Sequence, residues 1–176
     1  KMIFNNESFL IITDKKDERK EFQDNMKSYY KQVPFFLQKG IEMWNKDIIK
    51  AEDIVVKFES ASSLNGIGSN YTNLILLNFA NYKNEIQSKM ITNLFPIFSS
   101  FYNSKVLISS VPSEKDLYFK KLFLNAERKP GDPSKNAFVA LKTYWWESKD
   151  KYGDWKDDVI MLIGEEKFDL EYDLII

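Results

Sequence analysis

Uninterrupted apolar runs and apolar residues at helical spacing succeed each other in the first part of the chain. Phe9-Leu10-Ile11-Ile12 is typical of a buried strand, and we predict a strand over residues 3–13. Apolar and aromatic positions then recur every three or four residues, which predicts a long amphipathic helix that starts after an N-cap at Thr13-Asp14 and continues to Trp44. Pro34 lies inside this pattern, so we expect the helix to kink or break there.

The middle of the chain alternates short apolar runs with polar segments. Ile54–Phe58 predicts a second strand, and the sequence SASSLNGIGSN over 60–70 predicts a loop. Residues 74–79 fit either a strand or the start of a helix. We favour a strand that reaches about Asn81, followed by a helix over 83–102 with a kink at its proline.

Strand patterns dominate the last part of the chain. Val106–Val111 predicts a strand, and a weakened capping box at Ser113 and Asp116 predicts a short helix over 114–125. Ala137–Trp146 also predicts a strand. Residues 158–163 and 167–175 then predict a terminal hairpin with its turn at Gly164-Glu165-Glu166.

The expected order of elements places helices mostly early and strands mostly late. This order predicts the α+β class, with a mostly antiparallel sheet and two long amphipathic helices in the first two-thirds of the chain. A length of 176 residues is sufficient for one self-supporting core, so we predict a single globular domain over residues 1–176. Met2 is expected to be the natural first residue, and a mature chain without its leader is the alternative.

Cysteine and histidine are both absent from the sequence. Their absence excludes disulfides, thiolate metal sites, Ser-His-Asp triads and nearly all catalytic zinc sites. Catalysis would have to use carboxylates, Lys, Tyr or Ser. No apolar run reaches the roughly 18 residues of a membrane-spanning helix, so no membrane insertion is expected.

The net charge of −1 conceals a strongly acidic segment near the end of the chain. Residues 147–173 hold ten acids against four lysines, a charge of −6, and the other residues sum to +5. Only Arg19 and Arg128 among the 25 basic residues are arginine, the preferred residue for phosphate and guanine recognition, so direct nucleic-acid binding is not expected. An acidic segment attracts basic surfaces, or it serves only solubility.

No motif in the sequence indicates a specific catalytic or metal site. Asp158 with Glu165-Glu166-Lys167 loosely resembles the D…E-x-K core of metal-dependent nucleases, but the spacing is short and no basic groove accompanies it. Alternate carboxylates on a strand lie about 7 Å apart, too far for three of them to share one ion. Gly66-Ile67-Gly68 lacks the third glycine of a dinucleotide fingerprint and the Gly-Lys-Ser/Thr of a P-loop. We therefore predict no catalytic residue, metal or cofactor.

The acidic segment also carries aromatic residues that are common in binding interfaces. On a strand, Trp145 and Trp146 could not both face one core, so one of them would need another partner. On the predicted last strand, Phe168, Leu170, Tyr172 and Leu174 would form an apolar face opposite a face of carboxylates. The predicted partner-binding residues are Asp150, Asp154, Trp155, Asp157, Asp158, Glu165, Glu166, Asp169, Glu171 and Asp173.

A small, cysteine-free, locally acidic chain with a lysine- and isoleucine-rich bacterial composition and no catalytic motif resembles the immunity proteins of contact-dependent inhibition and other polymorphic toxin systems. That resemblance implies a cytoplasmic bacterial protein that is not an enzyme. It implies that the protein occludes the active site of a cognate basic toxin, such as a nuclease, through its acidic C-terminal surface. The alternatives are an envelope-associated or secreted binding domain, and a histidine-free hydrolase or nuclease that uses carboxylates.

Overall fold

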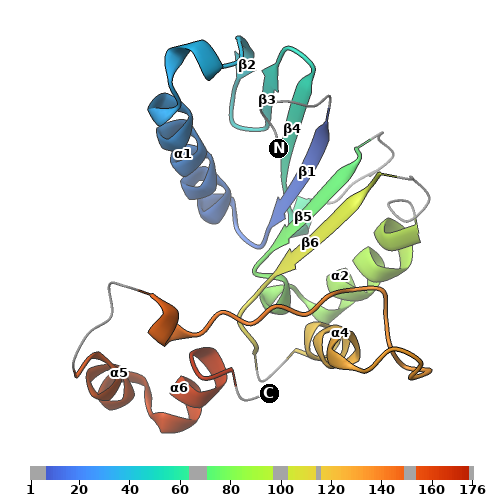
Figure 1. Ribbon diagram of the computed structural model, residues 1–176, viewed down its shortest axis with the longest axis vertical. Helices are drawn as coiled ribbons and strands as arrows, with labels where there is room; N and C mark the ends of the chain where they lie inside the picture. Colours follow the sequence, from blue (N-terminus) through green and yellow to red (C-terminus); the bar gives the residue numbers. More distant parts are fainter. Residues whose placement is uncertain (1–6, 64–70, 97–102, 114–115, 149–153, 175–176) are drawn as a thin grey trace. The chain divides into compact units, whose positions relative to one another are not determined.

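The computed structural model describes residues 7–63, 71–96, 103–113, 116–148 and 154–174 (Figure 1). The chain divides into two compact units, Lys1–Ser109 and Ser110–Ile176. No helix among the described residues is long and apolar enough to cross a membrane. The expectation of one globular domain over the whole chain stays a prediction.

The first unit is built on a six-stranded mixed sheet. Four strands are parallel to one another, and an antiparallel hairpin extends the sheet at one edge. The strands, in spatial order, are β2 (Ile41–Trp44), β3 (Ile48–Ala51), β4 (Ile54–Ser60), β1 (Ser8–Thr13), β5 (Asn73–Leu77) and β6 (Lys105–Ser109).

β1 lies between two parallel neighbours, and its side chains are buried on both faces. Phe9 pairs with Val56 of β4 on one side and with Asn73 of β5 on the other. Continuous apolar sequence is characteristic of such a strand, because helices cover both faces of a parallel sheet. At the far edge, β6 has no strand paired to its outer side within the described residues, and its Leu107 is 54% exposed.

One face of the sheet is covered by α1 (Lys16–Gln32) (Figure 1). Phe22 and Met26 of this helix pack against a cluster that includes Phe9 and Phe58. The helix ends with Val33 in an extended conformation, as expected for a residue that precedes proline. The break predicted near Pro34 is therefore confirmed, but the predicted helix beyond it is wrong, since that segment forms a 3₁₀ turn and strand β2.

The β2–β3 hairpin leaves a hollow beneath the C-terminal end of α1. This apolar cavity has a volume of about 110 Å³, and its walls include Met26, Tyr30, Trp44 and Ala51. The Asn45 side chain closes the hairpin by accepting hydrogen bonds from the backbone N–H groups of the last residue of the turn and the first residue of β3.

The opposite face of the sheet lies beside α2 (Asn84–Lys89) (Figure 1). Leu10, Leu74 and Leu76 point to this face by strand alternation, and all three are buried. A π-helical turn, Met90–Leu94, continues α2. Of the predicted helix over 83–102, the part up to residue 96 is thus confirmed as helical, and residues 97–102 lie outside the described residues.

The described part of the second unit contains helices and no strand. Asp116 begins its first helix by accepting hydrogen bonds from the backbone N–H groups of the next turn, including those of Phe119 and Lys120. The predicted cap at Ser113 is therefore replaced by a cap at Asp116. The helices are α4 (Tyr118–Glu127), α5 (Trp155–Ile163) and α6 (Glu165–Glu171), with a 3₁₀ turn at Trp145–Glu147.

An aromatic cluster holds the end of this second unit together. Phe168 of α6 is completely buried, and it contacts Trp145, Trp155 and Tyr172 at ring-centroid distances between 5.1 and 6.1 Å. The Trp145 indole N–H donates a hydrogen bond to Asp173 at 2.8 Å. This cluster is the core against which α5 and α6 pack.

These observations correct the predicted fold class. The sheet is mostly parallel and the fold belongs to the α/β class, so the expected α+β class with a mostly antiparallel sheet is wrong. The two predicted strands at the end of the chain are the helices α5 and α6, and Gly164 joins them with a φ of 86°, a conformation that glycine adopts readily. The predicted strand over 137–146 is extended chain and a 3₁₀ turn, with no strand pairing.

The acids of the last segment occupy positions that favour the two helices. Asp157 and Asp158 lie in the first turn of α5, and Glu165 and Glu166 lie in the first turn of α6. Carboxylates at a helix N-terminus interact favourably with the helix dipole.

Candidate functional site

The carboxyl ends of the four parallel strands meet at one edge of the sheet. A polar residue ends or directly follows each strand, and these residues are Asp14 after β1, Ser60 at the end of β4, Asn78 after β5 and Ser110 after β6. Ligands of open α/β sheets bind in the crevice outside this edge, where successive crossover helices switch from one face to the other. That switch occurs here between β1 and β5, because α1 covers one face and α2 lies beside the other (Figure 1).

Asp14 and Glu18 place two carboxylates at this switch point. They are four residues apart, at the end of β1 and in the first turn of α1. Burial raises the pKa of Asp14 above its ordinary value, the charge of Glu18 raises it further, and Lys15 opposes both effects. Oxygen Oε2 of Glu18 is buried, and it has no hydrogen-bond partner among the described residues. An unsatisfied buried carboxylate oxygen is costly, and such groups concentrate at functional sites.

Tyr82 connects the ends of the two strands beneath this carboxylate pair. Its hydroxyl lies 2.8 Å from the carbonyl oxygen of Ile12 and 2.9 Å from that of Leu77, and it donates to them. Burial raises the pKa of the Tyr82 hydroxyl well above its usual range, and the charges of Asp14 and Glu18 add to this shift. The phenol therefore stays protonated and can keep β1 and β5 at a fixed separation.

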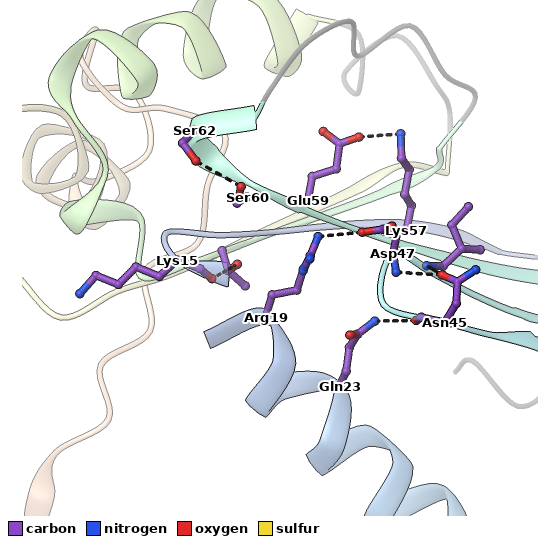
Figure 2. A network of polar contacts seen from close by, with 11 residues as sticks. Lys15, Arg19, Gln23, Asn45, Asp47, Lys57, Glu59, Ser60 and Ser62 are labelled. Atoms are coloured by element: carbon purple, nitrogen blue, oxygen red, sulfur yellow. Dashed lines mark hydrogen bonds and ion pairs between the residues drawn. The ribbon is translucent and has the colours of Figure 1, made fainter. Parts of the chain in front are cut away.

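Polar contacts attach the first half of α1 to the β2–β3 turn (Figure 2). The Arg19 guanidinium donates to the Asp47 carboxylate at 3.0 Å, and the Gln23 amide donates to the Asn45 carbonyl at 3.2 Å. Because Glu18 immediately precedes Arg19 on the helix, these contacts also fix the backbone that carries the carboxylate pair.

Two carboxylates are sufficient for Mg²⁺ when a phosphate group completes the coordination shell, since this ion usually keeps several waters and takes one or two protein carboxylates. The unsatisfied oxygen of Glu18 and the nearby Asp14 fit that requirement. Within the described residues there is no group of three or more acids that could hold a metal without other ligands.

The residues predicted to bind a partner are spread over the second unit. The alternating face of Asp169, Glu171 and Asp173 does not exist, because Asp169 and Glu171 lie on helix α6 and Asp173 lies in the turn after it. Asp173 accepts hydrogen bonds from Trp145 and from Lys156, and Trp155 packs in the aromatic cluster, so both have internal contacts.

The remaining predicted residues are acids of α5, α6 and their flanks, and their role in binding a partner stays a prediction. Asp150 lies outside the described residues. The exposed acids are Asp154, Asp157, Asp158, Glu165 and Glu166, and the half-buried ones are Asp169 and Glu171.

Sequence reasoning identified Asp14 only as a helix cap and did not single out Glu18 or Tyr82. Asp14 makes no capping hydrogen bond, and the Thr13 hydroxyl instead donates to the Lys15 carbonyl at 2.9 Å. The available signal was an acid directly after a continuously apolar strand, followed by a second acid one helical turn later.

No protein-family model and no curated protein sequence matches the chain. Solved structures do match. The chain is similar to the large terminase ATPase domain of Thermus phage P74-26, with a TM-score of 0.69 and 16% identity, over 97% of this chain and 76% of that one.

Two longer phage proteins also share the fold. The large terminase of bacteriophage HK97 gives a TM-score of 0.61 with 14% identity over 89% of this chain and 32% of that chain. The large terminase of a thermophilic bacteriophage, in its complex with ADP, gives 0.63 with 11% identity, over 94% of this chain and 40% of that chain.

These likenesses overturn the resemblance to toxin-immunity proteins. The inhibitor function and the basic toxin partner depended on that resemblance, and they are corrected with it. The same likenesses contradict the assignment as a non-enzyme, made from the missing catalytic motifs, and the exclusion of nucleic acid, made from the scarcity of arginine. The similarity at such low identity establishes that the described chain has the fold of large terminase ATPase domains.

Proposed function

We propose that this chain is part of an ATPase module of the large-terminase type, which couples ATP hydrolysis to the packaging of DNA. The observation that carries the proposal is the match of 97% of the chain to the P74-26 terminase ATPase domain. The terminase of the thermophilic bacteriophage, which has the same fold, is known as a complex with ADP. The absence of histidine and cysteine is compatible with this chemistry, because phosphoryl transfer depends mainly on positioning and charge stabilisation.

We place the bound nucleotide at the switch point between β1 and β5. Mg²⁺ bound with ATP would neutralise charge that develops on the β- and γ-phosphate oxygens. Asp14 and Glu18 are the residues that would hold that ion through its waters, or orient the water that attacks the γ-phosphorus. A carboxylate whose pKa is raised also accepts a proton from that water more readily.

We expect the loop that binds the phosphates of ATP to come from outside these 176 residues. The 176 residues contain no Gly-Lys-Ser or Gly-Lys-Thr sequence, so no P-loop lysine is present to contact the β- and γ-phosphates. The chain covers 76% of the P74-26 domain and smaller shares of the two longer terminases. We therefore assign to this chain the carboxylate side of the site, and to other polypeptide the phosphate cradle.

The test is ATP hydrolysis by the full-length natural protein, measured with and without double-stranded DNA. Asp14→Asn and Glu18→Gln are expected to lower the rate by about 10–100-fold, the range found when groups that orient metal ligands are removed. Asp24→Asn, an exposed substitution on the same helix, should leave the rate unchanged. Failure of the unmodified protein to bind or hydrolyse ATP would refute the ATPase proposal. Full activity of both carboxylate variants would instead refute the assignment of the site.

A further inference from the structure

The 3₁₀ turn that follows α1 carries two adjacent phenylalanine rings that are almost fully exposed. Phe35 is 88% exposed and Phe36 is 83% exposed. Their neighbours Leu37 and Ile41 are exposed as well. A single exposed apolar residue is ordinary on a protein surface, but a contiguous apolar patch marks an interaction site.

The apolar hollow beneath α1 opens beside these two rings. Val33 and Leu37 both line the hollow, and they stand on either side of Phe35 and Phe36 in the sequence. Leu37 and Ile41 are exposed as well as lining the hollow, so the hollow reaches the surface of the protein. The same surface therefore presents two projecting rings and one apolar recess.

The size of the hollow suits one aromatic ring. Its volume is about 110 Å³, and its walls are mostly aliphatic and aromatic, including Met26, Trp44 and Ile49. An apolar cavity of about 150 Å³ stays free of water and binds benzene. Methionine adapts its shape readily, so Met26 can adjust to a phenyl ring that enters.

Polar contacts fix the segment that carries the two rings. The Gln38 side-chain amide donates to the Val33 carbonyl at 2.7 Å, and the Tyr30 hydroxyl donates to the Lys39 carbonyl. Nζ of Lys39 also pairs with the Asp53 carboxylate at 2.7 Å. A segment that is already ordered loses little conformational freedom on binding, so the rings are held ready to bind a partner.

The rings and the recess suit a second copy of the chain. A surface that holds both can pair with itself about a two-fold axis, because each copy supplies the ring that the other copy receives. At their observed exposure, Phe35 and Phe36 would bury about 250–430 Å² in each copy. Stable complexes bury roughly 800 Å² per partner, so this area, with Leu37 and Ile41 added, indicates a weak and reversible pair.

We propose that this surface pairs two copies of the chain, with a phenylalanine ring of the 3₁₀ turn in one copy seated in the hollow of the other. The proposal does not depend on the ATPase proposal, because it uses no residue of the carboxylate site and needs no nucleotide.

The experiment measures the mass of the chain by sedimentation equilibrium at protein concentrations from about 5 to about 500 μM. The chain carries Leu107→Lys, so that association through the open edge of β6 does not contribute. We expect a reversible monomer–dimer equilibrium with a dissociation constant of about 10–100 μM. A chain that stays monomeric over the whole range overturns the proposal.

Matched variants test the projecting rings. Phe35→Ser/Phe36→Ser should raise the dissociation constant at least about tenfold, since rings that fill a pocket contribute most of the binding energy of an interface. The control is Met161→Ser/Leu162→Ser, which removes two adjacent side chains of α5 that are 84% and 83% exposed. Equal dissociation constants for the two double variants overturn the proposal.

Trp44 tests the recess, because it lines the hollow and is the only tryptophan of the sheet unit. Its indole N–H signal in NMR should shift in proportion to the dimer fraction, while the signals of Trp145, Trp146 and Trp155 stay constant. Ala51→Leu fills the hollow from within and should weaken pairing about five- to tenfold, with circular dichroism as the check that it folds. A dimer that forms without a shift of Trp44, or undiminished pairing of the folded variant, overturns the hollow as the receptor.

Discussion

Replacing Tyr82 with Phe removes a single oxygen at the point where β1 and β5 are joined. The Tyr82 side chain is only 3% exposed, and its hydroxyl lies within 2.9 Å of two backbone carbonyl oxygens, those of Ile12 and Leu77. Phe fills the same space without the donor. The substitution therefore tests the hydrogen bonds at the carboxyl edge with little change in packing.

The expected loss follows from the cost of a missing buried hydrogen bond. A neutral bond contributes about 0.5–1.5 kcal/mol net, and a buried group left without a partner costs about 1–3 kcal/mol. One hydroxyl proton serves two acceptors here, so we expect a decrease of about 1–2 kcal/mol in the free energy of unfolding. With a urea m-value of about 2 kcal/mol/M, the unfolding midpoint of this unit should fall by about 0.5–1 M.

The assay separates the two units. Three of the four tryptophans belong to the helical unit and only Trp44 to the sheet, so far-UV circular dichroism combined with fluorescence reports which unit unfolds first. Tyr29→Phe is the control, because Tyr29 is 69% exposed. An unchanged midpoint for the Tyr82 variant, or an equal decrease in the control, would refute the reasoning.

An alkaline titration gives a second readout of the same residue. Burial raises the pKa of Tyr82 in the folded state above the value of about 10 in the unfolded chain. A raised pKa contributes stability that is fully present below the unfolded pKa and is lost as the pH rises through the folded pKa. The unmodified protein should therefore lose stability above about pH 10, and Tyr82→Phe should remove part of that loss.

Three more substitutions test other parts of the structure. Asp14→Asn should raise the urea midpoint at pH 7, because the raised pKa of Asp14 makes its ionised form unfavourable in the folded state. The gain should shrink as the pH falls and vanish below about pH 4, the pKa of the unfolded chain, and a lower midpoint at pH 7 would contradict the prediction. Phe168→Ala should destabilise the helical unit by about 3–5 kcal/mol, since Phe168 is 0% exposed. An unfolding midpoint equal to that of the unmodified protein, followed by tryptophan fluorescence, would argue against the aromatic core. Ala51→Val should add about 0.5–1 kcal/mol of stability by filling part of the cavity beneath α1, and a loss measured by calorimetry would indicate that the hollow has no room for two methyl groups.

Much of the sheet could be predicted from local sequence, but its strand directions could not. The apolar runs at Phe9–Ile12, Ile54–Phe58 and Val106–Val111 all contain strands. The strand favoured from residue 74 to about Asn81 is confirmed only as far as Leu77, because Phe79–Asn81 forms a 3₁₀ turn. Pairing direction depends on the crossover that separates two strands. The uninterrupted apolar sequence of β1 was an indication of a parallel sheet, because it implies burial on both faces.

The end of the chain shows why a two-residue alternation can mislead. Phe168, Leu170, Tyr172 and Leu174 alternate with acids, but Phe168 and Tyr172 are also one helical turn apart and their rings stack 5.1 Å apart. Packing against Trp145 and Trp155 decides between the two periods, and these contacts are distant in sequence. The candidate site was missed for a similar reason, since Asp14 and Tyr82 are brought together only by the pairing of β1 with β5.

The open side of β6 has a consequence for handling the isolated chain. Leu107 projects into solvent from a strand whose outer backbone groups face no neighbouring strand within the described part of the chain. Such an edge is a template for intermolecular strand addition, and charged residues on edge strands oppose it. Lys105 supplies one such charge at the start of β6. We therefore expect the chain to self-associate through this edge as its concentration rises. Leu107→Lys should suppress this self-association.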